Sequence, residues 1–134
     1  MKELLGKTIT KVQMLGNDYI AFTTDTGKVI EYIAEADCCS TSWFAHIDNL
    51  KALIGNKINS VEARKMWTKE EIKKAESEGD YEALALYGYL LKTNKGTCDI
   101  EFRNDSNGYY GGSADLITLS KKQRKELKTI KKDF

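Results

Sequence analysis

Phe22-Thr23-Thr24-Asp25-Thr26-Gly27 and Leu91-Lys92-Thr93-Asn94-Lys95-Gly96 decide the fold that this sequence predicts. The first stretch runs into Ile30-Glu31-Tyr32 and the second into Ile100-Glu101-Phe102. Each ends in a glycine that can adopt positive φ, between runs rich in β-branched and aromatic residues. This pattern is typical of a β-hairpin, so the sequence predicts two antiparallel hairpins.

A weak internal repeat extends the pattern toward the N-terminus of each hairpin. Leu5-Gly6-Lys7-Thr8-Ile9-Thr10-Lys11-Val12 aligns with Ile54-Gly55-Asn56-Lys57-Ile58-Asn59-Ser60-Val61, with Gly, Ile and Val in matching places. Because a repeat sets the architecture, we interpret each half as a strand followed by a hairpin. We expect an antiparallel sheet of about six strands, built from two hairpin-containing repeats.

Three segments predict helices, which makes the expected fold class α+β. A central helix is expected over residues 43–54, after the N-cap candidates Ser40-Thr41-Ser42 and before Gly55. Its apolar residues at helical spacing are Trp43, Phe44, Ile47, Leu50, Leu53 and Ile54. A capping box at Thr68-Lys69-Glu70-Glu71 begins a short, exposed helical insertion over residues 68–79. A second capping box at Ser120 begins a C-terminal helix. Its apolar stripe is Leu127, Ile130 and Phe134.

Composition limits the function classes. The chain has 134 residues, no proline, one histidine, three cysteines and a formal net charge of +1. We expect a single domain over residues 1–134 in the cytoplasm, because no stretch is apolar enough for a membrane span or a secretory signal. A zinc site with several histidines is excluded within one chain, and we expect no metal or other cofactor.

Charge is segregated along the chain. Residues 120–134 contain seven Lys or Arg residues against Glu126 and Asp133, so the rest of the chain is acidic. A solvated helix face explains this run. The alternative is an anion site, formed where copies meet in an oligomer, that uses Arg124, Lys125 and Lys128.

Two stretches are dense in reactive or ligand-binding side chains. Asp37-Cys38-Cys39-Ser40-Thr41-Ser42-Trp43 is explained by capping and packing, although a helix N-terminus also suits phosphate. A Cys38 or Cys39 nucleophile with His46 as its base is a further alternative. Residues 102–113, Phe-Arg-Asn-Asp-Ser-Asn-Gly-Tyr-Tyr-Gly-Gly-Ser, offer donors, stacking faces and glycines that suit a nucleotide pocket, or a glycine-rich turn with surface tyrosines.

Taken together, these motifs resemble a family of small phage proteins, the Thoeris anti-defence proteins of the first type. The resemblance spans most of the chain. It rests on Leu5-Gly6-Lys7, Asp37-Cys38-Cys39-Ser40, Ser42-Trp43, His46-Ile47, Leu53-Ile54-Gly55 and Asn107-Gly108-Tyr109-Tyr110-Gly111-Gly112. It implies a sponge rather than an enzyme, a protein that binds glyco-cyclic ADP-ribose signals of bacterial TIR enzymes and leaves them intact. It also implies binding of cyclic di- or trinucleotides of CBASS defence and a homo-oligomer, dimer or hexamer, in the cytosol of the infected bacterium.

Carried onto this chain, the resemblance implies a pocket in which adenine stacks on Phe102, Tyr109 or Tyr110. Arg103 would meet the diphosphate, and Asn104 and Asn107 would bond base edges or ribose hydroxyls. Two further residues, Asp37 and Trp43, would complete or support the pocket. Two other functions stay open. One is an interaction protein that inhibits a host defence enzyme through the insertion and basic tail, and the other is a nucleic-acid-binding module.

Overall fold

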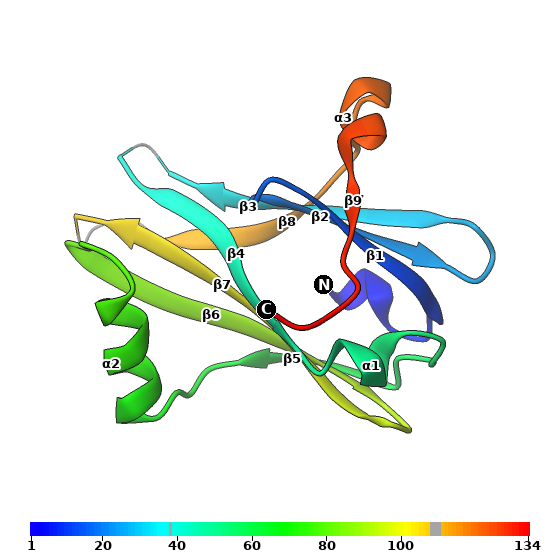
Figure 1. Ribbon diagram of the computed structural model, residues 1–134, viewed down its shortest axis with the longest axis horizontal. Coiled ribbons are helices and arrows are strands. Elements are labelled where there is room, and N and C mark those ends of the chain that lie inside the picture. The colour runs from blue at the N-terminus through cyan, green and yellow to red at the C-terminus, as the bar shows by residue number, and fades with distance from the viewer. Residues whose placement is uncertain (38, 108–110) are drawn as a thin grey trace.

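Nine strands form two antiparallel sheets in the computed structural model, which describes residues 1–37, 39–107 and 111–134 (Figure 1). The strands are β1 (Ile9–Leu15), β2 (Tyr19–Thr24), β3 (Val29–Ala36), β4 (Thr41–Asp48), β5 (Ser60–Arg64), β6 (Ala83–Thr93), β7 (Gly96–Ser106), β8 (Gly112–Ile117) and β9 (Lys128–Thr129). The helices are η1 (Lys2–Leu4), α1 (Leu50–Leu53), α2 (Lys69–Ser77) and α3 (Lys121–Glu126). The sheet orders are β8-β3-β2-β1-β9 and β4-β7-β6-β5.

The fold is α+β and strongly dominated by strands. The expectation of one sheet with about six strands is wrong, because the chain leaves the first sheet after β3 and starts a second sheet with β4. Both predicted hairpins are confirmed. β2 pairs with β3 and β6 with β7, and the turn residues Gly27 and Gly96 adopt φ of 86° and 136°. Glycine avoids the steric penalty that an L side chain has at these angles.

The expected central helix over residues 43–54 is wrong in its first half, which is strand β4. A bulge between Phe44 and His46 shifts the register against β7. Because one extra residue is inserted, Phe44 and Ile47 both face the core although they are three residues apart. A bulged strand therefore imitates helical spacing in the sequence. Only Leu50–Leu53 is helical, and Gly55 follows it at φ 80°.

The C-terminal helix is also shorter than expected. Its capping box is present, since the Ser120 hydroxyl accepts from the Gln123 amide at 3.1 Å, but α3 ends at Glu126. The chain then becomes extended and pairs with β1 through β9. The stripe of Leu127, Ile130 and Phe134 is therefore not one helix face. By contrast, the helical insertion is confirmed as α2, with a complete capping box at Thr68.

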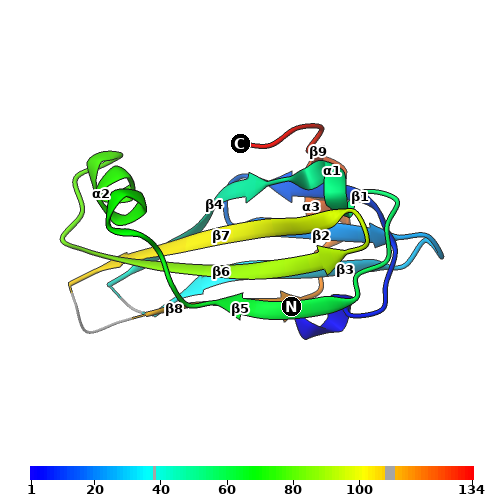
Figure 2. The same cartoon turned by 90° about the horizontal axis from the view of Figure 1, so that it is seen from below.

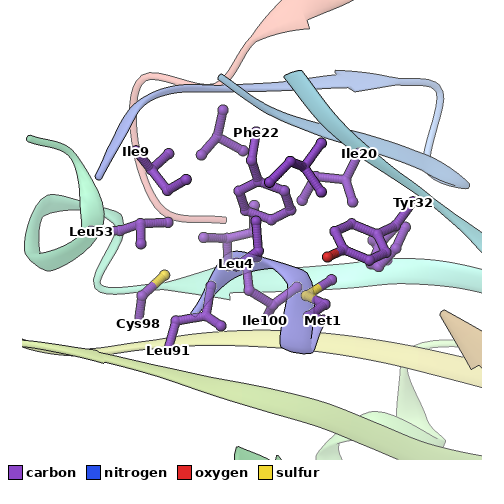
Figure 3. Packing of buried hydrophobic residues seen from close by; sticks show 14 of the residues in the cluster. Met1, Leu4, Ile9, Ile20, Phe22, Tyr32, Leu53, Leu91, Cys98 and Ile100 are labelled. Atoms are coloured by element: carbon purple, nitrogen blue, oxygen red, sulfur yellow. The ribbon is translucent and has the colours of Figure 1, made fainter. Parts of the chain in front are cut away.

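The core lies between the two sheets. Figure 3 shows Phe22, Ile20 and Tyr32 of the first sheet facing Leu91, Cys98 and Ile100 of the second, with Leu4 of η1 between them. All of these side chains are almost fully buried. Burial of such apolar area is the main stabilising contribution to folding.

Two chain segments close the open sides of the sandwich. On one side, η1 inserts Met1 and Leu4 into the core. On the other side, the C-terminal segment (residues 128–134) runs from the β1 edge to the β4 edge (Figure 2). The Ile130 amide donates to the Val12 carbonyl at 2.8 Å, and Phe134 and Ile47 exchange two backbone hydrogen bonds. The C-terminal segment is thus a bridge between the two sheets.

Candidate functional site

The predicted pocket residues of β7 lie on opposite faces of the strand. Phe102 and Asn104 point into the core, whereas Arg103 points to the outer face, where α2 packs. Neighbouring side chains of a strand alternate between faces, so a ligand cannot stack on Phe102 while its phosphate meets Arg103. The expected arrangement of these three residues in one pocket is wrong.

Phe102 and Asn104 are structural. The Phe102 ring is 3% exposed and stacks on Tyr87 at a centroid distance of 4.9 Å. Asn104 is fully buried, and its Nδ2 donates to the Ser42 hydroxyl at 2.9 Å. Because neither side chain reaches the surface, the predictions that Phe102 stacks on adenine and that Asn104 binds a base edge are wrong.

Arg103 fixes the insertion to the second sheet. Its guanidinium is 4% exposed and donates to Glu78 at 2.7 Å, just past the end of α2, and to Glu101 at 3.4 Å. The hydrogen bond from Arg103 holds the pKa of Glu78 below its usual value. Arg64 makes the equivalent bridge to Glu71 at 2.6 Å. These carboxylates already match the charge of Arg103, so the geometry does not favour the predicted contact with a diphosphate, which stays a prediction.

The cavity beside Arg103 is acidic. Its volume is about 320 Å³ and its lining contains more carboxylates than cations. The carboxylates are Asp48, Glu71, Glu78, Asp99 and Glu101, and the cations are Arg64, Lys74 and Arg103. His46 also lines it, with Nδ1 3.1 Å from the Phe134 carbonyl oxygen and Nε2 3.8 Å from Glu101. Burial raises the pKa of Asp99. A phosphate would meet a net negative field here, so this cavity does not suit an anion.

The remaining residues of the expected pocket are dispersed. Asp37 is exposed and lines a small polar pocket with Gly111–Ser113. Trp43 stacks on Tyr81 at 5.7 Å and is half-buried. Asn107 is exposed just past the end of β7. Tyr109, Tyr110 and one of the two candidate nucleophiles, Cys38, lie outside the described residues, so their predicted roles stay predictions.

The second anion site expected at Arg124, Lys125 and Lys128 is not assembled in the chain. Arg124 donates from Nη2 to Glu31 at 2.7 Å, and Glu31 is a 3% exposed carboxylate on the outer face of the first sheet. The second anion site is expected where copies meet in an oligomer, so its formation stays a prediction. Lys125 lies on α3 and Lys128 on β9, and both are exposed.

A different cavity combines positive charge with an apolar floor. It has a volume of about 850 Å³ and lies between β1, α1 and the C-terminal segment. We call it the lysine groove, and its charged residues are Lys11, Lys51, Lys131, Lys132 and Asp133. Its apolar residues are Val12, Leu50, Ile54 and Ile130, and two threonines, Thr10 and Thr129, add hydroxyls.

Among the residues that the structure describes, Asp133 is the one carboxylate in the groove lining, against four lysines, and it is held by α1. The two Asp133 carboxylate oxygens accept from the backbone amides of Asn49 and Leu50, each at 2.8 Å. The carboxylate thus satisfies the first amides of α1, which are unpaired within the helix. The four ammonium groups have no comparable fixed carboxylate in the groove lining. Sequence reasoning identified only the basic tail, because Lys11 and Lys51 join it through the tertiary fold alone.

Comparison with known proteins places the chain in a family. A family model described as a domain of unknown function, DUF7448, matches residues 2–116. The chain belongs to this family. It is also similar to an uncharacterized protein of Acanthamoeba polyphaga mimivirus, with 36% identity over 94 residues, which cover 66% of this chain and 68% of the viral protein. No solved structure matches the chain at a significant level.

Two absences hold for the described part of the chain. Within it, no helix has the length and apolar character needed to cross a membrane. Within the same residues, no three or more His, Cys, Asp or Glu side chains form a group that could hold a metal ion.

Proposed function

We propose that the protein binds and sequesters an anionic nucleotide signal of the glyco-cyclic ADP-ribose class without cleaving it. The observation that carries this proposal is the lysine groove, where four lysines surround an apolar floor. The class of ligand is the one that the resemblance to phage anti-defence sponges implies. The lysine groove is the proposed binding site, in place of the pocket expected at β7.

The chemistry of the groove matches the parts of such a ligand. A diphosphate carries two negative charges, and the ammonium groups of the lysines that line the groove can neutralise both. The aliphatic side chains of Ile54, which is 37% exposed, and of half-buried Ile130 offer apolar area to a purine face, and burial of that area favours binding. The hydroxyls of Thr10 and Thr129 can exchange hydrogen bonds with ribose hydroxyls.

The size of the groove is also suitable. Pockets for small molecules and cofactors typically have volumes of about 300–1,000 Å³. The lysine groove, at about 850 Å³, lies within this range and is larger than the acidic cavity beside Arg103. Because charge and volume both favour it, we assign the anion to the lysine groove.

The proposal includes the organisation of the whole chain. Residues 1–134 would act as one ligand-sequestering domain built from two repeats. A short helix and a glycine at positive φ, Gly6 or Gly55, precede β1 and β5, and this local similarity supports the repeat. We also propose a homo-oligomer, dimer or hexamer, in the bacterial cytosol, with cyclic di- or trinucleotides as further ligands.

A second candidate function is direct inhibition of a host defence enzyme by binding. The specific observation that favours it is exposed apolar area at the insertion. Met66, just before α2, is 84% exposed, and Ile72 of α2 is 39% exposed. An inhibitor of this kind would capture its target in the absence of any nucleotide, and Met66→Ser with Ile72→Ser would abolish the capture.

Isothermal titration with glyco-cyclic ADP-ribose tests the first proposal. We expect micromolar or tighter binding, followed by recovery of the unchanged ligand by chromatography after heat denaturation. The double variant Lys11→Ala/Lys131→Ala should bind at least about tenfold more weakly, a loss of about 1.4 kcal/mol. Lys73→Ala is the matched control, because Lys73 is an exposed lysine of α2 outside the groove. No binding, or a cleaved product, would refute sequestration.

The same titration distinguishes the groove from the pocket expected at β7. If Asn107→Ala and Tyr110→Ala weaken binding tenfold while the lysine variants bind normally, the ligand lies at the connection between β7 and β8. Unchanged binding in both of these variants is the result expected for the lysine groove.

A further inference from the structure

The two walls of the lysine groove come from separate parts of the chain. Lys11 of β1 and Lys51 of α1 belong to the body of the sandwich. Lys131 and Lys132 belong to the C-terminal segment. The groove is therefore complete only while the C-terminal segment lies against α1.

Asp133 makes the side-chain contact that joins these walls. Its carboxylate accepts hydrogen bonds from the Asn49 and Leu50 amides, each at 2.8 Å. In the sequence, Asp133 directly follows the two lysines of this wall, Lys131 and Lys132. Asn49 has a left-handed backbone with φ 61° and no side-chain cap of its own on α1. The carboxylate of a distant residue thus replaces the N-cap side chain that a helix usually takes from its own sequence.

We infer that Asp133 is the positioning residue of the lysine groove, and that a ligand with two linked phosphates binds between the walls and ties the C-terminal segment to the body. This inference rests on the proposed function and deepens it. A diphosphate can contact ammonium groups of both walls at once, whereas a monophosphate presents one anionic centre. Ligand binding and docking of the C-terminal segment are therefore coupled, because each stabilises the other.

The variant Asp133→Asn separates positioning from charge. It removes a negative charge from the groove lining, so electrostatics alone predicts tighter binding of an anion. The asparagine keeps one acceptor oxygen and turns an amide donor toward the second backbone amide, so the contact with α1 is weakened. Positioning thus predicts the opposite sign, weaker binding. Glu126→Gln is the matched control, since Glu126 is an exposed carboxylate at the end of α3 that does not line the groove.

The experiment measures ADP-ribose and AMP binding by calorimetry, together with amide hydrogen exchange, on the full chain. We expect Asp133→Asn to bind ADP-ribose about tenfold more weakly and Glu126→Gln to bind at least as tightly as the wild type. In the wild type, ADP-ribose should slow exchange at the Asn49, Leu50 and Ile130 amides more than AMP does at equal occupancy. Unchanged exchange at core amides of β1 and β2 in Asp133→Asn would show that the variant is folded.

The outcomes are distinguishable. Wild-type binding that Asp133→Asn leaves unchanged or tightens overturns the positioning role while the proposed function stands. Equal protection by AMP and ADP-ribose overturns the tie between the walls. Absence of wild-type binding to ADP-ribose and to glyco-cyclic ADP-ribose overturns the proposed function and the inference that rests on it.

Discussion

Replacement of Arg103 by methionine separates a structural arginine from a ligand-binding one. Methionine keeps much of the aliphatic length and removes the guanidinium that donates to Glu78 and Glu101. Removal of one member of a buried ion pair typically costs about 3–5 kcal/mol, because the other charge stays buried without a partner. Glu101, with a side chain 11% exposed, would lose this partner and keep only the longer contact with His46 Nε2 at 3.8 Å.

The cost at Glu78 is smaller. Its side chain is 34% exposed, so water can solvate the released carboxylate. The Arg103–Glu101 contact of 3.4 Å is also longer than a strong charged hydrogen bond. We therefore expect Arg103→Met to lower the free energy of unfolding by about 2–4 kcal/mol, somewhat below the range for a fully buried pair.

Urea denaturation followed by tryptophan fluorescence measures this loss. Lys74→Met is the matched control, because it removes a positive charge from the same cavity, and Lys74 is an exposed side chain. We expect a change within about 0.5 kcal/mol for that control. In the double variant Arg103→Met/Glu101→Gln, loss of the unpaired buried carboxylate should restore about 1 kcal/mol or more. The reasoning is refuted if Arg103→Met has normal stability and no longer binds glyco-cyclic ADP-ribose.

Three further predictions concern other parts of the molecule. Arg103 lowers the pKa of Glu78 in the folded state. The stabilising contribution of Glu78 is therefore complete above its unfolded pKa of about 4.3 and is lost as pH falls through the folded pKa. Between pH 5 and 3, urea midpoints should fall more steeply in wild type than in Arg103→Met, and equal slopes would contradict this. Gly112→Ala places a Cβ against the Ser42 hydroxyl and near Asn104, so we expect the free energy of unfolding to fall by about 1–3 kcal/mol in the same denaturation assay. An unchanged midpoint would mean that β8 shifts freely to make room. Burial raises the pKa of Cys98 to about 12, so its thiol should resist alkylation at pH 8 in the native state, as read by peptide mass spectrometry; rapid native labelling would indicate local opening of β7.

The sequence predicts the parts of the fold that depend on local chemistry. Gly27 and Gly96 mark real hairpin turns, and the capping boxes at Thr68 and Ser120 begin real helices. Each of these signals acts within a few residues, so a single sequence contains it in full. The two-sheet arrangement depends on long-range pairing and is not contained in any one segment.

The sequence predictions that fail are those that depend on contacts between distant parts of the chain. The bulge in β4 gives Phe44 and Ile47 a helical spacing, and no local rule distinguishes this pattern from a helix. Arg103 follows directly after an aromatic residue and resembles a phosphate ligand in sequence, while its partner Glu78 is 25 residues away. The partner of each charge is therefore set by the tertiary fold, and so is the gathering of lysines in the groove, which no single segment of the sequence contains.

The central claim is that the anionic ligand lies in the lysine groove, and methyl NMR spectroscopy tests it most directly. Titration of selectively methyl-labelled protein with glyco-cyclic ADP-ribose should shift the methyl signals of Leu50, Ile54 and Ile130, which line the groove. The Ile100 methyl signals, in the core between the sheets, should stay in place. Shifts confined to Leu84 and Leu86 of β6, with the groove signals unchanged, or no shifts at saturating ligand, would contradict the claim.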